Sequence, residues 1–221
     1  MRKLSAKEHS REKRKFSKLV IDQYKTLNRS VGPSKFAQDF RRLRDFAEAI
    51  FFGIGDKTVE SVTVKDIQEA LREIGGSYDL YRQQLEYVGN LAISALQGKP
   101  AEHFQGVDIT CSVCGGHYHL ETDHYECSGC GYIGKADQHG FPVSVPASDR
   151  VKSLRHLFHR RVKELYASCY TQEECYMLVA YQTNTPLPLV HAGLVTSAEL
   201  LLDMIHVCNE TIIHTKPVMA A

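Results

Sequence analysis

The sequence contains no run of about 18 apolar residues, the length that a membrane-spanning helix requires, so no membrane span is expected. Its N-terminal segment lacks the apolar stretch of a secretory signal peptide, which predicts a cytoplasmic protein. An excess of one charge sign is also missing, because 27 Lys and Arg residues stand against 26 Asp and Glu residues, a formal net charge of +1. Net charge alone therefore indicates no nucleic-acid partner, and the distribution of charge along the chain becomes the relevant evidence.

Motifs of several common enzyme classes are absent as well. The sequence has no GxSxG elbow, no phosphate-binding P-loop, no HExxH zinc motif and no glycine-rich dinucleotide fingerprint. Asp123 and Glu126 are carboxylates without an evident catalytic partner. We therefore expect no enzymatic activity.

The composition is that of a globular protein. Of the 221 residues, 43% are hydrophobic and 24% are charged, which excludes a wholly disordered chain. Helical periodicity dominates both ends of the sequence, and a short segment rich in Cys, Gly, His and Tyr separates them. We predict a mainly α protein with an N-terminal helical domain, a small β zinc ribbon and a C-terminal helical unit. The predicted segments are a basic arm at 1–15, a helical domain at 16–98, the ribbon with its connector at 99–147, and the C-terminal unit at 148–215.

The helices are predicted from apolar residues that recur at steps of three and four. In the second predicted helix these residues are Phe36, Phe40, Leu43, Ala47, Ile50 and Ile54. Helix starts are predicted where a capping residue precedes such a pattern, at Ser34, Thr63, Ser77, Ser148, Thr171 and Ser197. Asp66 follows Thr63 by three residues and imitates a capping box. The first helix is expected at 16–27, after an arm that is disordered or becomes helical on a partner.

Two cysteine pairs carry the strongest chemical signal. Cys111-Ser-Val-Cys114-Gly and Cys127-Ser-Gly-Cys130-Gly each place two thiols on one tight turn, and one hairpin is long enough to bring the two turns together. Four thiolates favour a tetrahedral Zn²⁺, although iron in a rubredoxin-like site shares this spacing. Such a site is closed, so the metal is expected to be structural. The alternative ligands are three histidines inside the hairpin, His117, His119 and His124.

The other three cysteines are Cys169, Cys175 and Cys208. They lie in helical or capping contexts, away from any second cysteine at metal-ligand spacing. We expect them to be buried as small hydrophobic residues.

Two basic segments are candidates for nucleic-acid contact. In the N-terminal arm the candidate phosphate ligands are Arg11, Lys13, Arg14 and Lys15, and the alternative is a solvated tail. In the helix that follows Ser148, the arc opposite the apolar face carries Lys152, His156, His159, Arg160 and Lys163. That arc contains no acid, so it predicts contact with nucleic acid or an acidic protein, and an ordinary solvated face is the alternative.

The ribbon also contains three tyrosines, Tyr118, Tyr125 and Tyr132. Tyrosine rings stack on bases in proteins that bind single strands. A ribbon this small also needs aromatic residues for its own core, and that interpretation is favoured.

Residues 34–96 resemble the helical core-binding domain of phage-type integrases. The residues that carry the resemblance are Ser34-Lys-Phe-Ala-Gln-Asp-Phe-Arg-Arg-Leu-Arg-Asp-Phe, Val62-Thr-Val-Lys-Asp-Ile-Gln-Glu-Ala-Leu and Tyr81-Arg-Gln-Gln-Leu-Glu-Tyr-Val. The resemblance implies a SAM-like fold that clamps DNA. The catalytic half of that family needs an HxxR motif, and here His159 stands where its Arg would be, so strand transfer is not expected.

Residues 109–208 are similar to a bacterial and phage zinc-finger-containing domain family of unknown function. The shared order is a pair of Cys knuckles, a Pro-containing connector, a basic helix with His156-Leu-Phe-His159, and a last helix after His191-Ala-Gly-Leu. This resemblance implies a fold and a mobile-element context.

Together these features predict a DNA-binding accessory or regulatory protein of a phage, plasmid or other mobile element, with duplex DNA as the partner and one structural zinc ion. The alternative is a protein-interaction module, such as an inhibitor or adaptor of a host complex. The near-zero net charge favours that alternative, because many DNA-binding domains are strongly basic.

Overall fold

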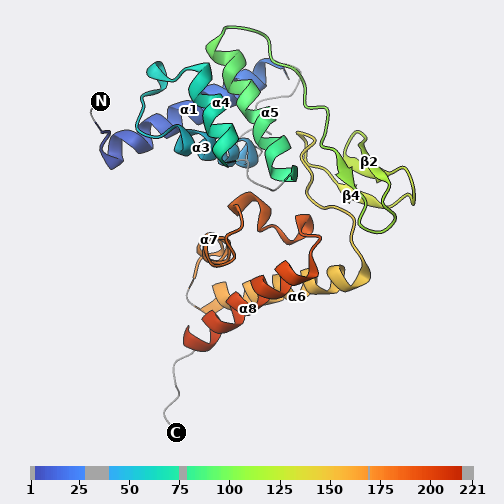
Figure 1. The fold of residues 1–221 in the computed structure, drawn as a ribbon. Coiled ribbons are helices and arrows are strands. Elements are labelled where there is room, and N and C mark those ends of the chain that lie inside the picture. The colour runs from blue at the N-terminus through green and yellow to red at the C-terminus, as the bar shows by residue number, and fades with distance from the viewer. Residues whose placement is uncertain (1–2, 28–39, 75–78, 169, 216–221) are drawn as a thin grey trace. The chain divides into compact units, whose positions relative to one another are not determined.

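The structure is a computed structural model that describes residues 3–27, 40–74, 79–168 and 170–215 (Figure 1). The chain separates into two compact units, Met1–Val107 and Asp108–Ala221. Most described residues are helical, and the second unit adds a small antiparallel sheet, which confirms the predicted mainly α class with a short β segment. The predicted helix starts at Ser34 and Ser77 lie outside the described residues.

The first unit packs helices around an apolar core. Its elements are α1 (Ala6–Leu27), α3 (Arg41–Ile54), the 3₁₀ turn η2 (Val59–Ser61), α4 (Val64–Ile74) and α5 (Asp79–Leu96). The side chains buried between them include Phe16, Val20, Leu43, Phe46, Ile50, Phe51, Ile67, Leu85 and Val88. This apolar stripe in each helix is what the spacing of three and four predicts.

A reciprocal cap begins α4, as the sequence predicted. The Thr63 N–H donates to Asp66 Oδ2 at 2.9 Å, and the Asp66 N–H donates to Thr63 Oγ1 at 3.3 Å. Two of the backbone donors that a helix start leaves unpaired are satisfied in this way.

The arm at 1–15, predicted to be disordered or to become helical on a partner, is helical from Ala6 onward within its own unit, because α1 begins there. Ser5 and Glu8 form a capping box: the Ser5 N–H donates to Glu8 Oε2 at 2.8 Å, and the Glu8 N–H donates to Ser5 Oγ at 3.3 Å. One turn later Glu12 is buried, and its carboxylate accepts a hydrogen bond from the Val59 N–H at 3.0 Å. The cap and this buried contact hold the basic segment in the helix despite its charge.

The residues after α5 belong to the first unit rather than to the ribbon. The Phe104 ring lies 4.7 Å from the Tyr87 ring, centroid to centroid. Gln23 Nε2 in α1 donates to the Lys99 carbonyl at 2.8 Å. The segment at 99–107 therefore packs on α1 and α5.

The second unit begins with the ribbon. Strands β1 (Ile109–Thr110), β2 (His117–Leu120), β3 (His124–Cys127) and β4 (Ile133–Lys135) form one antiparallel sheet in chain order. Tyr118 pairs with Cys127 across β2 and β3, and the short turn between these strands forms the predicted hairpin. A Cβ at Gly134 would lie 2.3 Å from the Ser144 carbonyl oxygen, so the connector after β4 packs closely against that strand.

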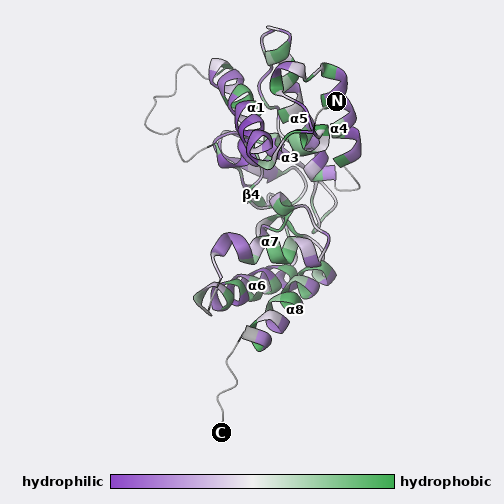
Figure 2. Ribbon diagram, turned by 90° about the vertical axis from the view of Figure 1, so that its left-hand side faces the viewer, coloured by the Kyte–Doolittle hydropathy of each residue, from purple (hydrophilic) through white to green (hydrophobic). Residues whose placement is uncertain are grey.

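Three helices complete the second unit: α6 (Asp149–Ser168), α7 (Gln172–Gln182) and α8 (Ala198–Thr215), with the 3₁₀ turns η3 (Leu187–Leu189) and η4 (Ala192–Leu194) before α8. Figure 2 shows both hydrophilic and hydrophobic residues along α6 and α8, as expected for amphipathic helices. The buried side chains include Phe158, Val162, Leu165, Val179, Leu201 and Met204.

The predicted caps of the second unit are confirmed. Thr171 and Glu174 form a capping box at the start of α7. Ser197 Oγ accepts from the Leu200 N–H at 3.1 Å, and Ser148 Oγ accepts from the Val151 N–H at 3.4 Å.

Candidate metal centre

Each cysteine pair lies on a turn that closes with the same backbone hydrogen bond. The Gly115 N–H donates to the Cys111 carbonyl at 2.8 Å, and the Gly131 N–H donates to the Cys127 carbonyl at 3.0 Å. Both glycines have positive φ, 76° at Gly115 and 66° at Gly131, where a Cβ would be strained. The glycine after each second cysteine therefore allows the turn that directs both sulfur atoms to one point.

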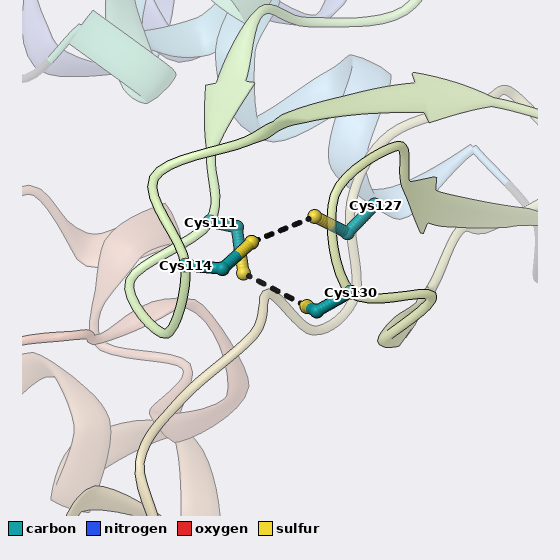
Figure 3. A group of neighbouring side chains, drawn as sticks. All are labelled: Cys111, Cys114, Cys127 and Cys130. Carbon is teal, nitrogen blue, oxygen red and sulfur yellow. Dashed lines mark hydrogen bonds between the residues drawn. The ribbon is translucent and has the colours of Figure 1, made fainter.

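The structure brings the four predicted cysteine sulfur atoms together (Figure 3). Cys114 Sγ lies 3.4 Å from Cys127 Sγ, and Cys111 Sγ lies 3.7 Å from Cys130 Sγ. All four sulfur atoms lie within 4.8 Å of one another. A tetrahedron with metal–sulfur bonds of about 2.3 Å has edges of about 3.8 Å, so these side chains can hold a metal ion.

Two further glycines leave room for the sulfur atoms. A Cβ at Gly129 would lie 2.9 Å from Cys114 Sγ, and a Cβ at Gly116 would lie 3.2 Å from Cys127 Sγ. The Gly129 N–H also donates to Cys127 Sγ at 3.4 Å. The backbone therefore approaches the sulfur atoms closely and supplies donors that stabilise thiolates.

The thiols differ in how readily they ionise. Burial raises the pKa of the Cys127 thiol, but the N–H groups of Cys130 and Gly129 and the neighbouring thiols lower it by more, so that the pKa falls to about 6. Burial raises the pKa of the Cys130 thiol to about 12. Negative charge on one sulfur atom disfavours charge on the next, and a bound cation removes that repulsion. The donor set therefore fits a divalent metal.

The ribbon histidines are not part of this group. His117 Nδ1 lies 2.9 Å from Asp108 Oδ1, and His124 Nδ1 lies 2.8 Å from Asp123 Oδ1. Among the described residues, the only group of three or more metal-ligating side chains is the four cysteines. The candidate site is therefore all sulfur, without the alternative histidine ligands.

The predicted basic arc of α6 is only partly one surface. His156, Arg160 and Lys163 are exposed, and Lys152 is half-buried with its Nζ 3.4 Å from Asp149 Oδ1. His159 differs, because burial lowers its pKa, and His156 and Lys163 lower it further.

His159 is turned toward the packed side of the unit. Its ring lies 6.3 Å from the His191 ring, centroid to centroid, and 6.1 Å from the Phe158 ring. It therefore departs from the exposed arc on which the sequence had placed it.

The four predicted residues of the N-terminal arm do not share one face of α1. Lys13 Nζ lies 2.8 Å from Glu48 Oε2. Lys15 Nζ lies 2.7 Å from Glu12 Oε1 and 3.1 Å from Glu60 Oε1. Arg11 and Arg14 are exposed. Lys13 and Lys15 are therefore paired with acids of the first unit, and their contact with phosphates stays a prediction.

Of the three ribbon tyrosines, two are buried and one is exposed. Tyr118 and Tyr125 are buried, and the Tyr125 hydroxyl donates to the Gly140 carbonyl at 2.7 Å. Tyr132 is 44% exposed, and Lys152 Nζ lies 5.0 Å from the centroid of its ring. The core interpretation therefore holds for two tyrosines, and the third links the second cysteine turn to α6.

Sequence reasoning missed Arg155, which ties the connector and the segment after η4 to α6. Its Nη1 donates to the Val145 carbonyl at 3.0 Å, while Nε and Nη2 donate to the Val195 carbonyl at 3.0 and 2.8 Å. Gly193 completes this contact, because its carbonyl accepts from the Val145 N–H at 2.9 Å. The only signal in the sequence is a cation on the apolar side of an amphipathic pattern.

Cys175 and Cys208 are buried in the core of the second unit, as predicted. Burial raises the pKa of the Cys208 thiol to about 12. Cys169 lies outside the described residues.

Comparison with protein-family models, curated proteins and solved structures finds no match to this chain. In the described part of the chain, no helix has both the length and the apolar character needed to cross a membrane.

Proposed function

We propose that the protein is a non-catalytic DNA-binding accessory or regulatory factor of a mobile genetic element, stabilised by one structural Zn²⁺. The ligands of the ion would be Cys111, Cys114, Cys127 and Cys130. Four thiolates leave no open coordination position for a catalytic water. We propose zinc rather than iron because a closed-shell ion favours a tetrahedron of thiolates, and elemental analysis of purified protein distinguishes the two.

The α6 surface supports the nucleic-acid part of the proposal. Lys152, Arg160 and Lys163 lie on the side of α6 opposite the buried Phe158 and Val162. Successive turns of the helix are about 5.4 Å apart, so these cations form a row along the axis. A row of cations neutralises phosphates one after another and releases their counterions.

The observation that carries the proposal is the contact between Lys152 and Tyr132, because it joins this row to the ribbon. Tyr132 follows Cys130 and Gly131, and Lys152 Nζ lies 5.0 Å from the centroid of its ring. Arg155 anchors the connector to the same helix. A metal that folds the ribbon would therefore also position an exposed aromatic ring beside the cationic row.

A salt series on a labelled duplex tests this proposal. We expect the parent to bind with an affinity that falls steeply with salt, and the variant K152A/R160A/K163A to bind more weakly with a shallower slope. The variant K65A/R72A/K99A removes the same charges from exposed positions of the first unit and is the matched control. If the parent does not bind duplex DNA at low salt, the proposal fails.

The mobile-element context rests on the resemblance of residues 109–208 to the zinc-finger-containing domain family and of residues 34–96 to core-binding domains. It is tested separately from DNA binding. Material purified from the native host should contain DNA of the element, and recovery of host chromosomal DNA alone would contradict this context.

A second candidate, a protein-interaction module, is favoured by the outer face of α7. Met177 is 46% exposed, and Tyr181, one turn later on the same face, is 83% exposed. Paired apolar side chains of this kind are common at protein interfaces. In that case M177A/Y181A would abolish recovery of a host protein in a pull-down assay and leave duplex binding unchanged.

A further inference from the structure

A row of cations lies on the outward face of α1. The sequence pattern alone did not distinguish these cations from the other cations of the same segment. Lys7, Arg11, Arg14 and Lys18 follow one another at steps of four, three and four residues, and all four are exposed. At about 100° per residue they fall within roughly 60° of arc. We call these four residues the α1 row. The buried residues Phe16 and Val20 lie on the opposite side of the helix.

Acids do not neutralise the first three members. Lys7, Arg11 and Arg14 form no ion pair with any residue that the structure describes. Lys18 pairs with Asp22, one turn further along. The α1 row is therefore a continuous positive surface from its first residue to Arg14.

Two other lysines of α1 are neutralised by acids. Lys13 contacts Glu48 of α3, and Lys15 contacts Glu12 and Glu60. Glu48 and Glu60 lie on elements that α1 packs against, and Glu12 lies on α1 itself. Within one segment, the inward cations are paired, whereas Lys7, Arg11 and Arg14 on the outward face form no ion pair with a described residue, so these three are available for an external anion.

Helix stability does not account for this arrangement. Like charges three or four residues apart repel each other and destabilise a helix. Cations in the first turns also oppose the helix dipole, whose N-terminal end is positive. A local feature that works against the fold is a mark of a functional surface.

We propose that the α1 row binds the phosphate backbone of duplex nucleic acid, as a second contact surface besides α6. The inference rests on the proposed function and assigns the first unit a direct part in it. The α1 row spans about 16 Å, which matches the rise of about five base pairs. The guanidinium groups of Arg11 and Arg14 suit bidentate contacts with phosphate oxygens.

The chemistry of the α1 row favours phosphates over an acidic protein. Protein interfaces have an apolar centre, and none of the large exposed apolar side chains in the described residues lies on α1. The α1 row is long and purely cationic, so we expect it to contact the phosphate backbone rather than base edges. It therefore predicts binding that is strong at low salt and independent of sequence.

The test compares K7Q/R11Q/R14Q/K18Q with K65Q/R72Q/R82Q/K99Q. Both variants remove two lysines and two arginines from exposed positions of the first unit, so their net charges are equal. Binding to a labelled random-sequence duplex is measured as a function of salt. We expect the first variant to bind at least tenfold more weakly at 50 mM salt, with a slope of log affinity against log salt that is shallower by about three to four. We expect the second variant to bind like the parent.

Circular dichroism melts accompany the binding assay. Removing repulsion should leave the melting temperature of the first variant unchanged or raised. If that variant is unfolded, R11Q/R14Q replaces it, with an expected shift in slope of about two.

Each outcome has a distinct consequence. If the α1 variant binds like the parent while K152A/R160A/K163A is weakened, the inference about α1 fails and the proposed function stands. If α1 matters and the α6 variant binds like the parent, the inference stands and the α6 surface is wrong. If the parent binds polyglutamate and not duplex DNA, the partner is an acidic protein and both proposals fail.

Discussion

The ribbon and the helices of the first unit are stabilised in different ways. The first unit buries aromatic and aliphatic side chains from all its described helices, among them Phe16, Phe46 and Phe51. The four strands bury few apolar residues, chiefly Ile109, Tyr118 and Tyr125, and their cysteine turns are open to solvent at Cys114 and Cys130. Apolar burial accounts for the first region, whereas the second brings together four sulfur atoms that could hold a metal ion.

The stability of the two regions should differ most when one metal ligand is removed. We expect Cys114→Ser to abolish stoichiometric metal binding, because it removes one of the four ligands. Structural zinc in small peptides contributes about 10–16 kcal/mol of binding free energy, so the effect should be large. Hydrogen exchange should become fast in β2 and β3 and stay slow in α3. The control is Val113→Ser, which changes an exposed residue of the same turn. A Cys114→Ser variant that retains one metal ion and the parent's exchange pattern would contradict a structural site.

The reverse experiment removes apolar packing from the first unit. Phe46 is 1% exposed, and its ring lies 5.3 Å from the Tyr81 ring. We expect Phe46→Ala to lower the free energy of unfolding of that unit by about 3–5 kcal/mol without loss of metal. Phe52→Ala, at a side chain that is 77% exposed, should change it by less than about 0.5 kcal/mol. Chemical denaturation with parallel metal analysis measures both, and loss of metal in Phe46→Ala would show that the two regions are not independent.

Glycine substitutions separate backbone strain from crowding at the sulfur atoms. Gly129→Ala places a Cβ 2.9 Å from Cys114 Sγ, so we expect a cost of about 1–3 kcal/mol and a metal affinity lower by about tenfold. Gly115→Ala meets no atom within 4 Å but has φ of 76°, so it should cost about 1–2 kcal/mol with little change in affinity. Competition with a chelator measures affinity. Equal affinities in the two variants would argue against close packing at the sulfur atoms.

The smallest expected effect concerns pH and the first unit alone. The hydrogen bond from Lys15 and then that from the Val59 N–H lower the pKa of the Glu12 carboxyl from its ordinary value of 4.5. The stabilisation is therefore present above pH 4.5 and is lost as the pH falls through the lowered pKa. Glu12→Gln should cost about 1 kcal/mol at neutral pH. Melting temperatures of parent and variant should converge in acid, and a constant difference across pH would exclude this linkage.

Local signals in the sequence predicted the elements that local chemistry controls. The cysteine turns follow from two-residue spacers and the glycines behind them. The cap at Thr63 follows from Asp66 three residues later, and the heptad-like spacing of apolar residues located the buried faces of α3 and α6. Each of these depends on neighbours within about one or two helical turns.

Contacts between distant residues were not predictable in this way. The basic character of residues 1–15 concealed the Ser5–Glu8 cap, and nothing near Lys13 or Lys15 indicates that Glu48 and Glu60 neutralise them. A basic segment can therefore be divided into inward and outward cations only after its helix is placed. The same holds for Arg155, because its acceptor Val145 lies 10 residues earlier in the chain and its acceptor Val195 lies 40 residues later.

The hydrogen bonds of Arg155 also bear on biosynthesis. The Val195 carbonyl is 40 residues from Arg155, so it leaves the ribosome well after α6. Until then the guanidinium lacks two of its bonds, although the Val145 carbonyl has already been made. Because contacts between distant residues form late, and α8 supplies core residues such as Leu201 and Met204, the second unit should complete its folding only after α8 has emerged. Nascent chains that stop before that point should be preferred targets of cellular proteases.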